Sequence, residues 1–129
     1  MNLDSRIRQV LGRHEGVRLA ILFGSLAGGR ATPQSDLDLA ILMAARLSVE
    51  TRMALVDELS QAIGRPVDLI DLRVAGQPLL GQILKHGVRL MGSDAAYAEL
   101  LKRHLFEEAD FMPYRRRILA ERRQAWIGK

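Results

Sequence analysis

Two aspartates separated by one residue, Asp36 and Asp38, begin an apolar segment and suggest a site for a divalent cation. On a β-strand, residues i and i+2 point to the same face, with their Cα atoms about 7 Å apart. Two carboxylates on one face repel each other unless a positive charge lies between them. Because Mg²⁺ prefers oxygen ligands and commonly joins carboxylates to substrate phosphates, the pair predicts a magnesium site for a phosphorylated substrate.

A Gly-Ser pair, Gly24 and Ser25, follows an earlier apolar segment and is suited to hold the phosphates. Glycine lets the backbone approach a ligand closely. Backbone N–H groups at the start of the following turn attract phosphate oxygens, and the serine hydroxyl adds a donor. One segment for phosphate and one for metal together predict phosphoryl or nucleotidyl transfer.

A third carboxylate would complete the site, and the segment from Pro66 to Leu72 offers two. Strand alternation places Asp68 on one face and Asp71 on the opposite face, nearer the strand end. We choose Asp68 as the third metal ligand and as acceptor for the proton of the attacking hydroxyl, and keep Asp71 as the alternative. A lone Asp-x-Asp usually marks a turn or a solvated edge, but the three segments together favour a site over coincidence.

These side chains need a sheet to position them, and the apolar periodicity predicts one. Short apolar runs predict strands over residues 17–23, 36–42, 66–72 and 88–92. Helices are expected after a cap at Asn2 or Asp4, after Ser48, from Pro78 and after Ser93. The order predicts an α/β (α+β) fold: one domain with a small mixed sheet, helices packed on it and a C-terminal helical tail. Residues 1–93 are the expected core, and residues 94–129 a helical extension of the same domain.

The same periodicity predicts which helix positions are buried. It places the following residues on core-facing surfaces: Val49, Met53, Val56, Leu59, Ala62 and Ile63 in the second helix, Leu79, Leu80, Ile83 and Leu84 in the third, and Ala95, Ala98, Leu101, Leu105 and Ala109 in the last. Met43 is likewise expected in the core.

The string GSLAGGRATPQSDLDLAI resembles the signature of the DNA polymerase β-like nucleotidyltransferase superfamily, in which Gly-Ser precedes Asp-x-Asp by ten residues. Within it, the chain resembles the minimal nucleotidyltransferase (MNT) domains, which are often antitoxin partners of HEPN-domain toxins. The resemblance runs from about residue 17 to residue 92. It implies the polymerase β-like nucleotidyltransferase fold, with ATP as substrate and Mg²⁺ as cofactor.

The resemblance also implies roles for single residues. Gly24 and Ser25 would contact the triphosphate of ATP, while Asp36, Asp38 and Asp68 would bind Mg²⁺ and act in catalysis. Antitoxin members transfer AMP from ATP to a tyrosine hydroxyl on the toxin, which silences its ribonuclease activity.

The turn between the two motifs departs from the family pattern. Many relatives carry arginine at the position of Gly28, and this chain has Gly28-Gly29-Arg30 instead. We expect Arg30 to serve as a phosphate contact from its neighbouring position, and Ser35 to join the nucleotide site. If Arg30 does not, the chain acts by binding its partner.

Two other functions stay open at this point. The chain could be a non-catalytic antitoxin that neutralises its partner by covering it. It could also be a nucleotidyltransferase that acts on a small molecule or an RNA end, because the motif handles the nucleotide and not the acceptor.

Composition narrows the partners. The chain has no cysteine, which excludes a disulfide scaffold, a Cys-ligated zinc site and thiol catalysis and fits the cytoplasm. Its longest apolar run, Leu39 to Ala45, is too short to span a bilayer, so no membrane partner is expected. The 129 residues leave little room for an acceptor domain, which predicts a hetero-oligomer with the toxin.

The C-terminal segment is the expected docking element. Pro113 is expected to break or kink the last helix. Beyond it, a basic amphipathic stretch carries Arg115, Arg116, Arg117, Arg122, Arg123 and Trp126. Trp and Arg are common interface anchors, and interspersed acidic residues disfavour direct nucleic-acid binding.

Overall fold

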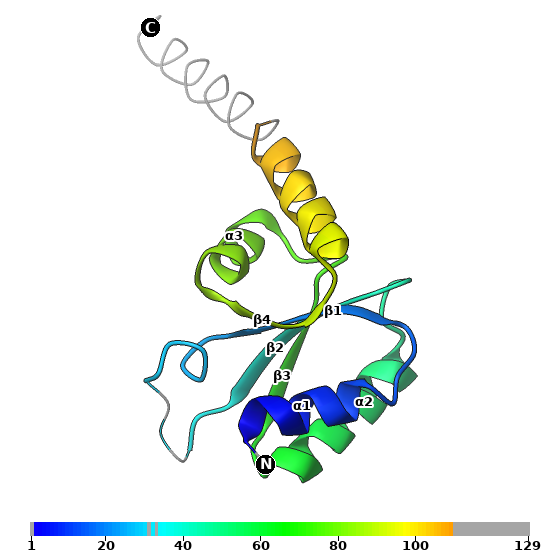
Figure 1. Cartoon of the computed structure of the whole chain (residues 1–129), viewed down its shortest axis with the longest axis vertical. Coiled ribbons are helices and arrows are strands. Elements are labelled where there is room, and N and C mark those ends of the chain that lie inside the picture. Colours follow the sequence, from blue (N-terminus) through cyan, green and yellow to red (C-terminus); the bar gives the residue numbers. More distant parts are fainter. Residues whose placement is uncertain (1, 31, 33, 110–129) are drawn as a thin grey trace, which may run out of the picture.

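A four-stranded mixed sheet forms the centre of the protein, between two layers of helices (Figure 1). The computed structural model describes residues 2–30, 32 and 34–109. The strands are β1 (Val17–Phe23), β2 (Leu37–Met43), β3 (Val67–Asp71) and β4 (Val88–Gly92), in the order β3-β2-β1-β4. β1 is antiparallel to β2 and β4, whereas β2 and β3 are parallel. The four predicted strands are confirmed, with boundaries that shift by at most one residue.

Three of the helices begin after a predicted cap, and the third helix along the chain begins one residue before the predicted start at Pro78. In α1 (Leu3–Leu11), Asn2 accepts a hydrogen bond from Ser5 N, and in α2 (Val49–Ile63), Ser48 accepts one from Thr51 N. α3 (Gln77–His86) has proline in its first turn, and a last helix over residues 94–109 begins after Ser93, whose hydroxyl accepts from Ala96 N. Side-chain acceptors satisfy N–H groups that a helix start leaves unpaired, so these short segments can be helical.

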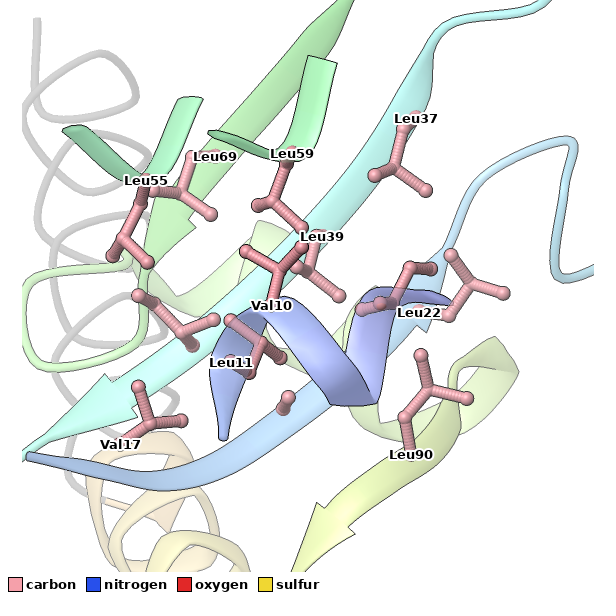
Figure 2. Close-up of a cluster of buried hydrophobic side chains, with 13 residues drawn as sticks. Val10, Leu11, Val17, Leu22, Leu37, Leu39, Leu55, Leu59, Leu69 and Leu90 are labelled. Atoms are coloured by element: carbon pink, nitrogen blue, oxygen red, sulfur yellow. The ribbon is translucent and has the colours of Figure 1, made fainter. Parts of the chain in front are cut away.

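The main core lies between the sheet and the layer of α1 and α2 (Figure 2). It joins side chains of both helices to every strand of the sheet: Ile7, Val10, Leu11, Val17, Ala20, Leu22, Leu37, Leu39, Ile41, Leu55, Leu59, Leu69 and Leu90. Burying apolar surface of this kind contributes roughly 25 cal/mol per Å². This layer therefore holds β2 and β3 in place from beneath the candidate site.

A second core lies on the other face of the sheet, under α3 and the last helix. It contains Leu19, Ile21, Ala40, Leu72, Leu80, Ile83 and Leu100. Side chains of β2 alternate between the two cores, with Leu39 in the first and Ala40 in the second. Residues of even number in β2 therefore face α3, and this sets the direction of Asp38.

The predicted buried faces of the helices are wrong in part. Val49 and Met53 of α2 are 69% and 66% exposed, and the buried positions are Leu55 and Leu59. Since Leu55 lies about 200° around the helix from Met53, a helix that docks through Leu55 turns Met53 to solvent. Met43 is partly buried against the main core, as expected.

The same error recurs in the layer on the other face. Leu79 of α3 is exposed. In the last helix Leu101 and Leu105 are exposed, and Leu100 is buried instead. Apolar residues on neighbouring positions allow two overlapping stripes, and packing against α3 selects the one that contains Leu100.

Two expectations concern residues beyond the described range. The break at Pro113 and the docking stretch around Arg115 and Trp126 lie outside it, and the boundary between residues 93 and 94 stays a prediction. Within residues 2–109, apart from positions 31 and 33, no helix is both long and apolar enough to cross a membrane.

Candidate active site

Two of the predicted carboxylates lie side by side at the start of the parallel strand pair. Asp38 of β2 is the register partner of Asp68 of β3, and paired residues of neighbouring strands point to the same face. That face is the one covered by α3, because Leu37 and Leu39 on either side of Asp38 belong to the opposite core. Asp36 lies two residues before Asp38, is exposed, and is close enough to influence its charge.

The carboxylates repel one another. The pKa of Asp38 is raised above its ordinary value, first because burial disfavours its charged form, and then because Asp68 and Asp36 are negative. A cation at this position would offset all three causes. The electrostatics of the cluster are therefore those of a cation or metal–phosphate site.

Gly24 packs directly against this cluster. Its φ is +74°, and a Cβ atom at this position would collide with Oδ2 of Asp38. Phe23, the last residue of β1, is the register partner of Asp38, so the chain turns away immediately beside the carboxylate. Only glycine suits both the backbone conformation and the contact.

The residues after Gly24 form a compact turn. The carbonyl of Gly24 accepts hydrogen bonds from the N–H groups of Ala27 and Gly28, each at 3.2 Å, and the carbonyl of Ser25 accepts from Arg30 N at 3.1 Å. Within the described residues, the Ser25 hydroxyl has no hydrogen-bond partner of its own. The first residues of the turn thus keep a hydroxyl available beside the carboxylates.

The Arg30 side chain folds back over Gly28. The place where a Cβ of residue 28 would lie is 3.4 Å from Nε and 3.5 Å from Nη2 of Arg30. The guanidinium therefore fills the space in which an arginine at position 28 would begin. A cleft of about 550 Å³ opens here, lined by Phe23, Gly24, Gly28, Arg30, Gln82 and His86.

Ser35 has a different position from the one expected for a nucleotide ligand. Its hydroxyl accepts a hydrogen bond from Thr32 N at 2.8 Å, and its carbonyl accepts one from Nη1 of Arg65 at 2.9 Å. Ser35 does not line the cleft. In this structure it shapes the loop that leads into Asp36, and Arg65 holds that loop to the start of β3.

Asp71 is separated from the other aspartates. It is 3% exposed, and its two oxygens accept hydrogen bonds from Leu47 N at 2.9 Å and Arg73 N at 3.0 Å. Its register partner is Ile41, near the far end of β2. The geometry thus brings Asp68 and not Asp71 together with Asp38.

The chain is similar to known proteins over most of its length. The family model for Polymerase beta, Nucleotidyltransferase matches residues 5–96, which include every residue placed above. The chain belongs to this nucleotidyltransferase family. The match agrees with the fold expected from the sequence, a mixed sheet in a single domain.

A curated relative of this nucleotidyltransferase is the protein adenylyltransferase MntA of Shewanella oneidensis. It is 38% identical over 77 residues, a match that covers 60% of this chain and 55% of MntA. The chain thus spans about half the length of this relative.

Solved structures extend the similarity over nearly the whole chain. A chain in the crystal structure of a toxin–antitoxin with AMP-PNP has a TM-score of 0.80 and 28% identity, over 92% of this chain and 96% of that chain. A chain in the structure of a tri-AMPylated Shewanella oneidensis HEPN toxin in complex with MNT antitoxin has a TM-score of 0.74 and 25% identity, over 92% and 94%.

The donor set of this nucleotidyltransferase fits a metal that is shared with the substrate. Among the residues the structure describes, no three imidazole or carboxylate side chains enclose a metal ion by themselves. Mg²⁺ is commonly held by one or two carboxylates together with substrate phosphates and water. A cluster in which two neighbouring carboxylates raise the pKa of Asp38 fits that mode, and does not fit a closed all-protein cage.

Two residues of the cleft were missed by sequence reasoning. Gln82 and His86 come from α3, far along the chain from residues 24–38. The pairing of β4 with β1 brings the end of α3 beside Gly24. Neither strand alternation nor the spacing of motifs in the sequence predicts this proximity. Arg73, which follows β3, donates from Nε to the carbonyl of Met43, at the other end of β2.

Proposed function

We propose that this nucleotidyltransferase transfers AMP from ATP to a tyrosine hydroxyl of a cognate HEPN ribonuclease toxin and thereby neutralises it. The observation that carries the proposal is the in-register pair Asp38 and Asp68 packed against Gly24. The family match and the similarity to a protein adenylyltransferase and to toxin–antitoxin complexes support this acceptor. The partner would form a hetero-oligomer with the chain, in the cytoplasm where ATP is present.

In this proposal, one set of residues binds the metal and another binds the phosphates. Asp36, Asp38 and Asp68 would hold Mg²⁺, which when bound neutralises phosphate charge and lowers the pKa of the attacking hydroxyl. Gly24 and Ser25 would hold the triphosphate through backbone N–H groups and the free hydroxyl. This positioning aligns the acceptor oxygen with the α-phosphorus and contributes most of the rate enhancement.

The reaction is an in-line displacement at phosphorus. The tyrosine oxygen forms a bond to the α-phosphorus, and the bond from that phosphorus to the α,β-bridging oxygen breaks. Pyrophosphate leaves with the electron pair, and the phenolic proton passes to the Asp68 carboxylate and then to solvent. AMP ends on the tyrosine through a phosphodiester.

Arg30 takes the phosphate role that relatives give to an arginine at position 28. Its guanidinium already lies against Gly28, facing the cleft that begins at Gly24. An arginine forms short, charge-assisted hydrogen bonds with phosphate oxygens, and Arg30 needs no rearrangement of the turn to do so. We assign Ser35 no direct contact with the nucleotide, because its hydroxyl already shapes the loop.

The test is transfer of label from α-labelled ATP to the cognate toxin, together with the intact mass of the toxin. Asp36→Asn combined with Asp38→Asn is expected to fold and to abolish transfer, whereas Asp57→Asn on the exposed side of α2 leaves it unchanged. Normal transfer by the double variant would contradict the proposal.

The same experiment separates the alternatives. Neutralisation of the toxin without a gain in mass, retained by the double variant, indicates an antitoxin that acts by binding alone. Transfer to a small molecule or an RNA end in the absence of any protein partner indicates a different acceptor.

A further inference from the structure

The wall of the cleft opposite the Gly24 turn is formed by α3. Gln82 and His86 lie four residues apart, and therefore on one face of this helix, and both line the cleft with Arg30. Both side chains are exposed. Three side chains that can donate N–H groups thus face one space, and in the described part of the chain no acidic residue lines it.

These donors have no acceptor in the part of the chain that the structure describes. Among the described residues, neither Gln82 nor His86 makes a side-chain hydrogen bond, and the Arg30 guanidinium has no acceptor. Gln77 and His14, by contrast, are paired: Gln77 bonds His104 at 2.6 Å, and His14 bonds Glu58 at 2.5 Å. Donors without acceptors, gathered around one cavity, are suited to a ligand with many acceptor oxygens.

The position of the cleft suggests which part of a nucleotide it would hold. It starts at Gly24, whose backbone touches Asp38, and continues past Gly28 to Arg30 and α3. An α-phosphate beside Asp38 leaves the β- and γ-phosphates to extend into this space. Its volume of about 550 Å³ is within the range of small-molecule sites.

We propose that Gln82 and His86 bind the β- and γ-phosphates of the nucleotide and hold the pyrophosphate as it leaves, from the side opposite Gly24 and Ser25. The inference rests on the proposed function in one respect, that the ligand is a nucleoside triphosphate. An imidazole has at least one N–H and an amide has two, so both side chains can donate to phosphate oxygens. The partial negative charge at the C-terminal end of α3 opposes an anion there, and the guanidinium of Arg30, which lines the same cleft, offsets it.

A contact with the base is the competing arrangement for these two residues, and it has a different signature. Removing a contact with the phosphates lowers the affinity for ATP, GTP, CTP and UTP by the same factor and also lowers the affinity for pyrophosphate. Removing a contact with the base alters the ratios among the affinities for the four nucleotides and leaves the affinity for pyrophosphate unchanged.

The experiment measures dissociation constants of the full chain for Mg-ATP, the other three nucleotides, AMP and inorganic pyrophosphate. Gln82→Ala and His86→Ala are each expected to raise the dissociation constants for the triphosphates and for pyrophosphate about tenfold. The dissociation constant for AMP should hardly change. Lys85→Ala is the matched control: it removes a charge from the same turn of α3 but lines a different groove, so affinity should hardly change. His86→Gln keeps a donor and should restore part of the loss.

The outcomes separate this inference from the proposed function. Unchanged constants in the Gln82→Ala/His86→Ala double variant, or a loss equal to that of Lys85→Ala, overturn the inference even if AMP transfer occurs. A changed ratio among the four nucleotides also overturns it. If Gln82→Ala and His86→Ala lose affinity for pyrophosphate but the wild-type protein transfers no AMP to the toxin, the inference is sustained and the proposed function is contradicted.

Discussion

Asp68 and Asp71 are three residues apart in one strand, yet the fold uses them in opposite ways. Asp68 is exposed, makes no hydrogen bond within the described residues, and lies beside Asp38. Asp71 is buried and accepts two backbone hydrogen bonds. A carboxylate whose oxygens are free of protein donors, and which lies beside a second carboxylate, is available to a ligand. A carboxylate whose oxygens are both satisfied instead holds the loop before α2 to the end of β3.

The largest expected effect is on Asp68. Asp68→Asn should reduce the rate of AMP transfer by at least about 100-fold, because it removes a metal ligand and the acceptor of the phenolic proton. The free energy of unfolding should hardly change, since the side chain makes no hydrogen bond to any of the residues that the structure describes. Single-turnover transfer to the toxin, with urea unfolding alongside, measures both. Transfer within a few fold of wild type would remove Asp68 from the site.

The reverse pattern is expected for Asp71. Asp71→Asn replaces one acceptor oxygen by an amide that faces a backbone N–H, and should lower the free energy of unfolding by about 1–3 kcal/mol. The folded fraction should transfer AMP at a rate close to that of wild type. Urea unfolding and active-site titration separate the two quantities. A stable but inactive variant would show that the contrast between the two aspartates is wrong.

A smaller effect is expected at Arg30, which belongs to the phosphate side of the site. Arg30→Ala should raise the KM for ATP about tenfold through the loss of a charge-assisted hydrogen bond. Adding Gly28→Arg should recover part of the loss, because the space beside residue 28 is then vacant. Arg13→Ala, on the exposed turn after α1, is the control. If the second substitution recovers nothing, the two positions are not equivalent.

The smallest effect is the pH dependence of stability that Asp38 imposes. Because the pKa of Asp38 is raised in the folded chain, the folded state binds more protons than the unfolded state, and stability falls as pH rises through that window. Asp38→Asn should therefore stabilise the free chain at neutral pH, by less than about 1 kcal/mol since water screens the carboxylate.

Thermal unfolding without nucleotide or metal, from pH 3 to pH 8, measures this difference. The stability difference between wild type and Asp38→Asn should shrink as pH falls below the ordinary pKa of aspartate. Under those conditions residue 38 is neutral in both proteins. A difference that is the same at every pH would show that repulsion within the carboxylate cluster is not its cause.

Local sequence patterns predict much of the candidate site. Gly24, Ser25, Asp36 and Asp38 lie at the ends of two apolar runs, and a run that ends in glycine is typical of a strand that meets a turn. Asp68 could be preferred to Asp71 only on strand parity, and the register with Asp38 supports that preference. A role for Ser35 at the nucleotide stays a prediction, because a serine in a polar loop has the same appearance in the sequence whether it caps a turn or binds a ligand.

The chain's own sequence determined the strands, the helix caps, the Gly-Ser and Asp-x-Asp pairs and the family, because these depend on residues close together and on periodicity. Only the tertiary structure decided which face of each helix is buried, as Met53 and Leu101 show. It alone also decided that Arg30 covers Gly28, and that Gln82 and His86 face Gly24. The physical reason differs among the three. A helix can bury either of two equivalent apolar stripes, and Gly24 lies more than 50 residues from Gln82 and His86, so packing against the sheet settles both. Arg30 and Gly28 are close in the sequence, but their contact depends on how the turn after Gly24 folds back on itself.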